Sequence, residues 1–264
     1  MDGRFLFLGT SGSLGVPIIG CRCSVCVSIS PRNKRRRCSA LIAIGGKKLL
    51  IDAGPEIRQQ LLDAEVDAID GALITHAHYD HVAGIDDLKA FTFAQKKKLP
   101  ILLSRQTYDE VTFRSAYLME TVNNRKQGIH FDFQVLDDLS GIASFAGLSI
   151  QPISYIQVGM PVTGFKIGNL AYLSDIKEYT PQLIQSVLGV DVLIVSALRY
   201  TASPMHLSVD EAIALARKIG AKQTYFTHMS HEIDYTKGLA HLPEGIAFAY
   251  DGLAIPFSYD KGIR

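Results

Sequence analysis

Short apolar runs alternate with a few amphipathic stretches along the whole chain. Runs rich in β-branched and aromatic residues between turn residues predict strands, whereas apolar residues spaced by three and four predict helices. The predicted strands are Arg4–Leu8, Leu41–Ile44, Lys48–Ile51, Ala72–Ile74, Ile101–Leu103, Leu148–Ile153, Phe165–Ile167, Leu170–Leu173, Val192–Val195, Tyr225–Phe226, Ile246–Ala249 and Leu253–Pro256. The predicted helices are Pro55–Leu62, Asp86–Gln95, Thr107–Leu118, Pro181–Val187 and Ser208–Ile219. No linker rich in proline or serine divides these elements, so residues 1–264 are expected to form one domain.

Three of the predicted strands end in a small polar residue that is followed by a side chain able to bind a metal ion. The segments are Leu73–His76, Tyr172–Asp175 and Tyr225–His228. Strand ends are rigid, and the loops that leave them can meet at one rim of a sheet. The pattern therefore predicts that His76, Asp175 and His228 belong to one site.

The composition supplies ample material for a core. Of the 264 residues 47% are hydrophobic, and 27 basic residues against 26 acidic ones leave a net charge of +1. These values exclude a disordered chain and argue against a protein whose whole surface binds nucleic acid. No apolar run approaches the roughly 20 residues that span a bilayer, and the N-terminus lacks the basic region of a signal peptide. We expect a cytoplasmic protein without a membrane partner.

The strongest chemical signal is the segment Thr75–His81, with the sequence THAHYDH. Its imidazoles and carboxylate are costly to bury without partners, and both groups are common metal ligands. His76 and His78 lie two residues apart, so an extended chain places them on the same side. Asp80 and His81 follow after a turn and can face a second ion.

This segment resembles the HxHxDH signature of the metallo-β-lactamase-fold hydrolases. Asp52, Asp175 and His228 are similar to the family's early aspartate, its bridging aspartate and its late histidine. The resemblance covers essentially the whole chain and implies an α/β (α+β) fold with four αββα layers. It also implies that His76 and His78 bind one ion, that Asp80, His81 and His228 bind the other, and that Asp175 contacts both.

One position departs from the family pattern. Gln157 stands where the family usually has a histidine, and an amide oxygen is a weaker ligand than imidazole for a transition metal. We therefore expect one tightly bound transition metal ion and a second, labile one. Gln157 is retained as a weak ligand or a substrate contact, and His130, the nearest spare imidazole, is the alternative ligand.

A second cluster of ligands lies in Cys21-Arg22-Cys23-Ser24-Val25-Cys26. Soft thiolates at this density favour zinc, which needs four ligands in a structural site. Either Cys38 or a distant histidine is a candidate for the fourth ligand. The CxCxxC pattern is similar to that of a subgroup that includes the cyclic phosphodiesterase of bacterial phosphonate degradation. In that subgroup a histidine three residues after the late active-site histidine completes the site, which implies His231.

Three further segments carry candidate functions. His206 is similar to the family's histidine near the leaving group and, with Asp80, is a predicted catalytic residue. The basic run Lys34–Arg37 is either a solvated face or an attractor for phosphate. The loop Gly9–Gly15 lacks the spacing of a phosphate-binding loop, so we expect it to be a flexible loop near the active site.

The residues themselves predict metal-assisted hydrolysis, and the resemblance implies a phosphodiesterase acting on a small or cyclic phosphodiester through a metal-bound hydroxide. The alternatives are an endonuclease that processes the 3′ end of transfer RNA, and a relative that has lost catalysis because of Gln157. The implied cofactors are a structural Zn²⁺ and one or two active-site ions, Zn²⁺ or Mn²⁺. Binding of nucleic acid is disfavoured, and a homodimer is left open.

Overall fold

The computed structural model describes residues 1–118, 130–137, 139 and 141–260, and in this part of the chain the strands form two seven-stranded sheets. The first sheet has the order β14-β1-β2-β3-β4-β5-β6, and the second has the order β13-β12-β11-β10-β9-β8-β7. The strands of the first sheet are β1 (Asp2–Gly9), β2 (Ser39–Ile44), β3 (Lys47–Ile51), β4 (Gly71–Leu73), β5 (Leu99–Ser104), β6 (Phe131–Leu136) and β14 (Ala254–Ser258). Those of the second are β7 (Ala143–Phe145), β8 (Leu148–Gln157), β9 (Met160–Ile167), β10 (Leu170–Leu173), β11 (Val192–Ser196), β12 (Gln223–Thr227) and β13 (Ile246–Phe248).

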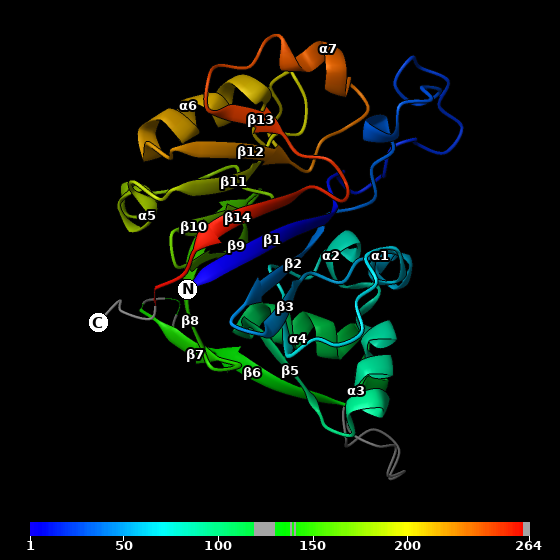
Figure 1. Cartoon of the computed structure of the whole chain (residues 1–264), viewed down its shortest axis with the longest axis vertical. Helices are drawn as coiled ribbons and strands as arrows, with labels where there is room; N and C mark the ends of the chain where they lie inside the picture. Colours follow the sequence, from blue (N-terminus) through cyan, green and yellow to red (C-terminus); the bar gives the residue numbers. More distant parts are fainter. Residues whose placement is uncertain (119–129, 138, 140, 261–264) are drawn as a thin grey trace.

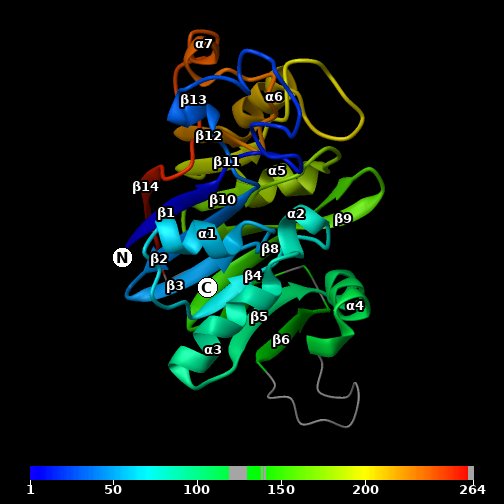
Figure 2. The ribbon, with the colours of Figure 1, turned by 90° about the vertical axis from the view of Figure 1, so that its right-hand side faces the viewer.

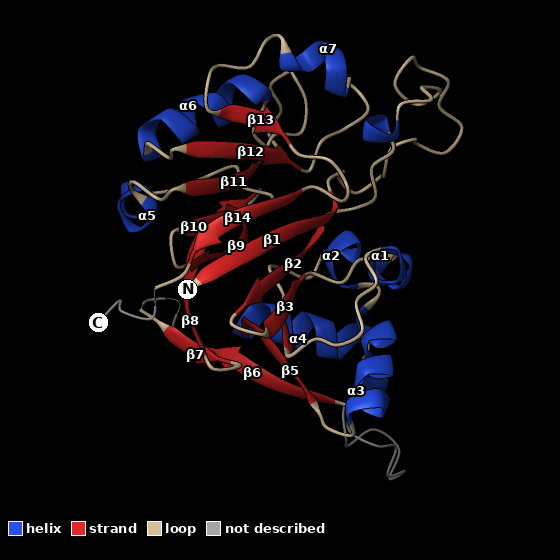
Figure 3. Cartoon of the chain, viewed as in Figure 1, coloured by secondary structure: helices blue, strands red, loops and turns tan. Residues whose placement is uncertain are grey.

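The two sheets lie face to face, and helices cover the outer side of each (Figure 1; Figure 3). The helices near the first sheet are α1 (Ile57–Asp63), α2 (Tyr79–Val82), α3 (Lys89–Gln95) and α4 (Arg105–Arg114), with the short 3₁₀ turns η2 (Ile85–Leu88) and η3 (Ala116–Leu118). Those near the second are α5 (Pro181–Val187), α6 (Val209–Ile219) and α7 (Tyr235–Leu239). A further 3₁₀ turn, η1 (Pro31–Asn33), lies in the loop between β1 and β2. This arrangement confirms the predicted αββα sandwich.

The apolar residues divide into three main clusters that correspond to the interfaces between these layers. The middle cluster joins the two sheets, with Phe5 and Ile42 from one and Phe165 and Tyr172 from the other. One outer cluster packs α1 and α4 on the first sheet, and the other packs α5 and α6 on the second. Burial of both faces explains why the central strands are nearly continuous apolar runs.

Parallel pairing places the strand ends that matter for function at one edge. In the first sheet β3, β4 and β5 are parallel, and in the second β10, β11 and β12 are parallel. Figure 2 shows how the sheets stack when the molecule is turned by 90°. The segments after β3, β4, β10 and β12 are those that carry Asp52, the Thr75–His81 motif, Asp175 and His228.

Most predicted elements are present, with shifted ends. The predicted helix Ser208–Ile219 is α6, where Ser208 caps the first turn, Glu211 completes a capping box and Gly220 adopts the left-handed conformation. The prediction for Asp86–Gln95 is corrected to two elements, η2 followed by α3, and Thr107–Leu118 divides into α4 and η3. Among the described residues no helix combines the length and apolar character that crossing a bilayer requires.

Candidate metal centre

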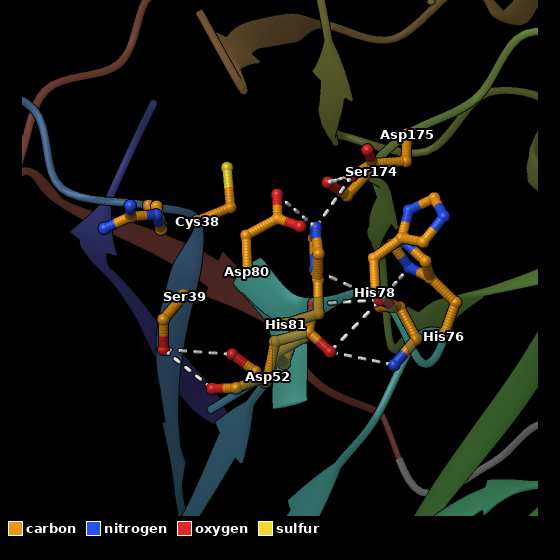
Figure 4. Close-up of polar contacts among 12 residues, drawn as sticks. Cys38, Ser39, Asp52, His76, His78, Asp80, His81, Ser174 and Asp175 are labelled. Carbon is orange, nitrogen blue, oxygen red and sulfur yellow. Dashed lines mark hydrogen bonds and ion pairs between the residues drawn. The ribbon is translucent and has the colours of Figure 1, made fainter. Parts of the chain in front are cut away.

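Asp52 and the Thr75–His81 motif are joined by buried hydrogen bonds at the ends of β3 and β4 (Figure 4). The backbone N–H of Thr75 donates to Asp52 Oδ1 at 2.8 Å, and the Thr75 hydroxyl donates to Oδ2 at 2.9 Å. His81 Nδ1 lies 2.7 Å from Asp52 Oδ2. A hydrogen bond at Nδ1 orients the ring and leaves Nε2 free as a ligand atom, as is usual for metal-binding histidines.

Ligand atoms of four residues, Asp80, His81, Asp175 and His228, lie close together where the two sheets meet and form a cage. Asp80 Oδ2 lies 3.4 Å from His81 Nε2 and 3.5 Å from His228 Nε2. Asp175 completes the cage, with Oδ2 3.2 Å from His81 Nε2 and Oδ1 3.1 Å from His228 Nε2. A tetrahedral zinc site with bonds of about 2.0–2.1 Å separates its ligand atoms by about 3.3–3.4 Å, so the spacing suits a divalent ion.

The hydrogen bonding of this cage also indicates a metal. Nε2 of His81 and both ring nitrogens of His228 are buried and have no hydrogen-bond partner among the described residues. Buried polar atoms are normally paired, and an unpaired one needs an explanation. A cation bound here would pair with Nε2 of His81 and Nε2 of His228 together with the carboxylates, so the donor set fits the divalent ion that the fold family implies.

The carboxylates and imidazoles of the cage stabilise each other's charged forms. Burial opposes the charged form of His81, but Asp175, Asp52 and Asp80 together raise its pKa well above the ordinary value. Burial would likewise raise the pKa of Asp175, but His228 and His81 hold it well below the ordinary value. The site therefore keeps its carboxylates ionised, which is the form that binds a cation.

His76, His78 and Gln157 lie beside this cage. His76 Nε2 is 3.0 Å from His78 Nδ1, and His76 also has a ligand atom within 4.8 Å of ligand atoms of His81 and Asp175. Gln157, at the end of β8, is 3% exposed, and its Nε2 atom lies 3.4 Å from Asp175 Oδ1. The alternative ligand His130 is elsewhere, since its Nδ1 lies 2.8 Å from the Thr92 hydroxyl and its ring packs on Phe93.

His206 lies at the same centre. Its Nδ1 is 3.6 Å from Asp175 Oδ1, and Gln157 Nε2 lies 3.1 Å from its Nε2. Burial, assisted by the charge of His228, lowers the pKa of His206 to about 4. The ring is therefore neutral near pH 7, which suits donation of a hydrogen bond to a substrate oxygen better than delivery of a proton from an imidazolium.

Three site residues have left-handed backbone conformations. The φ angles are +58° at Asp52, +59° at Asp175 and +57° at His228, each directly or closely after a strand. Aspartate and histidine tolerate this conformation better than β-branched residues, but it still costs free energy and is concentrated at functional sites. At Asp175 and His228 the side chain after the turn enters the cage, whereas at Asp52 it contacts Thr75 and Nδ1 of His81.

The cysteine cluster lies in the loop between β1 and β2 and meets the segment after β12. His231 Nδ1 is 3.3 Å from Cys21 Sγ and 3.5 Å from the Sγ atoms of Cys23 and Cys26. A hydrogen bond from the backbone N–H of Cys26 lowers the pKa of the Cys23 thiol to about 6, which favours the thiolate that binds metal. Cys38, the alternative fourth ligand, is buried elsewhere, with Sγ 3.4 Å from the Thr227 hydroxyl.

The side chains of the basic run Lys34–Arg37 differ in exposure: Lys34 is exposed, Arg36 and Arg37 are half-buried, and Arg35 is buried. Arg35 is 2% exposed, and its Nη2 donates to the carbonyl oxygens of Ser230 at 3.0 Å and Ile233 at 2.9 Å. Arg36 pairs with Asp63 at 2.6 Å, and Arg37 pairs with Glu56. The three arginines therefore make ion pairs or hydrogen bonds within the chain, and Arg35 holds the segment that carries His231.

The loop Gly9–Gly15 lies near the centre, as expected. A Cβ atom added at Gly12 would lie 3.0 Å from Cε1 of His228, and the backbone N–H of Met229 donates to the Thr10 carbonyl oxygen. This contact leaves no room for a larger side chain against the His228 ring without a shift. The loop therefore forms part of the wall around the site.

The facing sheets and the cage at their common edge define a metallohydrolase of the αββα class. Residues 47–229 match the family described as the beta-lactamase superfamily domain, and the chain belongs to this family. A solved structure described as a new diphosphatase from the PhnP family superposes with a TM-score of 0.90 at 30% identity, over 98% of both chains. Zinc-bound PqqB from Methylobacterium extorquens gives a TM-score of 0.77 at 20% identity, over 96% of this chain and 99% of that one, a likeness of fold alone.

One longer relative is named for an acyl-transfer activity and not for hydrolysis of a phosphate ester. An octanoyltransferase from Porphyromonas gingivalis is 33% identical over 264 residues, which are 99% of this chain but 53% of the relative. The chain thus spans about half the length of this relative. The activity in that name belongs to the whole relative and does not pass directly to the matched half.

Proposed function

We propose that the chain is a metal-dependent phosphoesterase that hydrolyses a small phosphodiester or a diphosphate ester. The observation that carries this proposal is the cage of Asp80, His81, Asp175 and His228, with His206 beside it. The similarity to the diphosphatase supports the choice of a phosphorus centre, because it extends over both whole chains.

Each residue of the site has a separate role in the proposed reaction. Ions bound by the cage and by His76 and His78 would supply a nucleophilic water at neutral pH and neutralise phosphate charge. Asp52 orients His81, and Ser174, whose hydroxyl donates to Asp175 Oδ2 at 2.7 Å, orients the shared carboxylate. Neutral His206 donates an N–H to an oxygen of the phosphoryl group or the leaving group.

The cysteine cluster belongs to the same proposal. We infer that Cys21, Cys23, Cys26 and His231 hold a structural zinc ion, as in the cyclic phosphodiesterase subgroup that the CxCxxC pattern resembles. Three sulfur atoms around one imidazole nitrogen support a Cys₃His site. Such a thiolate site is most easily maintained in a reducing compartment, which is in keeping with a cytoplasmic protein.

The proposal is tested with purified protein supplied with Zn²⁺ or Mn²⁺. The substrates are bis(p-nitrophenyl) phosphate, a dinucleoside diphosphate, a precursor transfer RNA and p-nitrophenyl octanoate. We expect turnover of the first or second substrate. We also expect His206→Ala to lower kcat by about 10²–10³-fold, as for loss of one hydrogen-bond donor to the transition state, whereas His241→Ala, at an exposed histidine, retains activity.

The other substrates represent the rival functions. Cleavage of the precursor transfer RNA alone would replace the proposal by the processing endonuclease. Hydrolysis of the octanoate ester alone would favour an acyl substrate, as the name of the longer relative suggests. Absence of turnover with every metal and substrate would favour a relative that has lost catalysis.

A further inference from the structure

The cage of Asp80, His81, Asp175 and His228 has four donors without any contribution from Gln157. Two are carboxylate oxygens and two are imidazole nitrogens, and the nitrogens have no other partner among the described residues. His81 is also fixed by Asp52 at 2.7 Å. Two imidazoles and two carboxylates, with one imidazole oriented by a further carboxylate, are a donor set that suits tightly bound zinc.

Outside this cage the set of ligand atoms lacks a third imidazole and includes a weaker donor. His76 Nε2 lies 3.0 Å from His78 Nδ1, and a ligand atom of His76 lies within 4.8 Å of a carboxylate oxygen of Asp175. The place of a third imidazole is taken by the amide of Gln157. Binding of a second ion therefore depends on whether the Gln157 amide supplies a ligand atom.

The surroundings of Gln157 indicate that its oxygen is available as a ligand. The side chain is 3% exposed, and its Oε1 atom has no hydrogen-bond partner among the described residues. Its Nε2 atom lies 3.4 Å from Asp175 Oδ1. Half a turn of the amide about its last bond exchanges the two atoms and places the oxygen at that distance, which is an ordinary separation for two ligands of one ion.

The chemistry of an amide oxygen differs from that of the imidazole it replaces. Imidazole suits zinc, whereas carbonyl and carboxylate oxygens suit harder ions such as manganese and magnesium. A site with two imidazoles, one shared carboxylate and one amide oxygen therefore has a weaker preference for zinc than the cage beside it. The two positions should differ both in affinity and in the ion that they take.

We propose that the centre holds a mixed pair of ions, a tightly bound zinc in the cage and an exchangeable manganese at His76, His78, Asp175 and Gln157. The inference rests on the proposed metal centre. It concerns the identity of the ions, so it is tested by binding and not by turnover. A lack of phosphoesterase activity would contradict the proposed function while leaving this inference intact.

The experiment compares the wild-type chain with Gln157→His and Gln157→Met. Each protein is loaded with Zn²⁺ and dialysed, and the retained zinc is counted by inductively coupled plasma mass spectrometry. Mn²⁺ is then titrated into the dialysed proteins, and free Mn²⁺ is followed by its six-line electron paramagnetic resonance signal. A difference in zinc between variants does not depend on how much zinc the cysteine cluster holds.

We expect Gln157→His to retain one more zinc per chain than the wild type and to take up no manganese. Gln157→Met keeps the length of the side chain without the oxygen. It should retain as much zinc as the wild type and bind Mn²⁺ at least about tenfold more weakly. If Gln157→Met does not fold, the comparison with Gln157→His decides the outcome.

A matched control is Gln151→His, which makes the same change on the same strand, β8, at a half-buried position opposite Lys166. It should retain the zinc and manganese of the wild type. Equal zinc in the wild type and Gln157→His would overturn the proposal. So would undiminished manganese binding by Gln157→Met, or an extra zinc in Gln151→His.

Discussion

Nδ1 of His81 lies 2.7 Å from the carboxylate of Asp52, which comes from a different strand end and is fully buried. Burial raises the pKa of Asp52, although His81 and Thr75 oppose this effect. The carboxylate thus depends on these partners to remain charged. This pair joins β3 to the metal-binding motif and sets the direction in which His81 presents Nε2.

Asp52→Asn should weaken metal binding while leaving the cage residues in place. An asparagine keeps one acceptor oxygen but has no negative charge to stabilise the imidazole, and loss of such a partner costs about 10–100-fold in metal affinity. Competition with a coloured zinc chelator measures the affinity. Asp67→Asn, at an exposed aspartate that pairs with Lys48, is the control and should have no effect. Equal zinc affinity in Asp52→Asn and the wild type would contradict the assigned role.

Cys23→Ser should remove one zinc per chain and lower the melting temperature by roughly 5–10 °C, as expected for a loss of about 3 kcal/mol. The cause is that the cluster joins the loop between β1 and β2 to His231, so the ion closes a long loop. Scanning calorimetry and metal analysis measure the two effects. Ser24→Ala, at an exposed position of the same loop, should change neither. A Cys23→Ser protein with unaltered zinc and melting would show that the cluster holds no structural ion.

Arg35→Met should destabilise the fold by about 3–5 kcal/mol, because it removes the donor to two carbonyl oxygens on either side of His231. Urea unfolding measures the loss. Arg36→Met removes an ion pair of partly exposed side chains, 35% and 48% accessible, and should cost about 1 kcal/mol or less. Similar losses in the two variants would mean that burial of Arg35 carries no special stabilisation.

The stability of the fold should depend on pH through Asp251. Burial raises its pKa to about 6, well above the ordinary value for an aspartate, against hydrogen bonds from the Arg36 backbone N–H and the Thr10 hydroxyl. Between about pH 4 and pH 6 the unfolded chain loses this proton before the folded chain does, so stability falls as pH rises. The loss is on the order of 2–3 kcal/mol and is complete above the folded pKa.

The comparison with Asp251→Asn isolates this effect from the other titrating groups. Urea unfolding at pH 4, 5, 6 and 7 gives the free energy of unfolding of both proteins. The stability of the wild type relative to the variant should decline from pH 4 to pH 6 and then level off. A difference that stays constant over this range would show that Asp251 has an ordinary pKa in the folded chain.

The strand ends that carry the site could be predicted from the sequence because the signal is local. A buried run that ends in a small polar residue and a ligand marks His76, Asp175 and His228, and parallel pairing then brings them to one edge. Short elements and exposed elements have a weaker hydrophobic pattern in the sequence. The helix α2 (Tyr79–Val82) is one turn long, so no period can be measured within it. The strand β6 (Phe131–Leu136) was not predicted, although Phe131-Asp132-Phe133-Gln134-Val135 alternates as a half-buried strand does.

The role of Arg35 could not be predicted from the sequence. In a run of four basic residues each side chain has the same local signal, which is that of a solvated surface. Its partners are carbonyl oxygens almost 200 residues away, and only the folded chain brings them together. The same is true of Asn33, whose Oδ1 accepts from the backbone N–H of Tyr235 at 2.9 Å.

The left-handed turns at Asp52, Asp175 and His228 have a consequence for how the protein acquires its ions. Each turn is an unfavourable conformation that the surrounding sheets impose, at about 1–3 kcal/mol per residue. The strands before these turns are paired in the sheets, so the fold itself supports the strained conformations. Uptake of an ion should therefore require little rearrangement, so the apoprotein can be reloaded quickly and repeatedly without passing through an unfolded state.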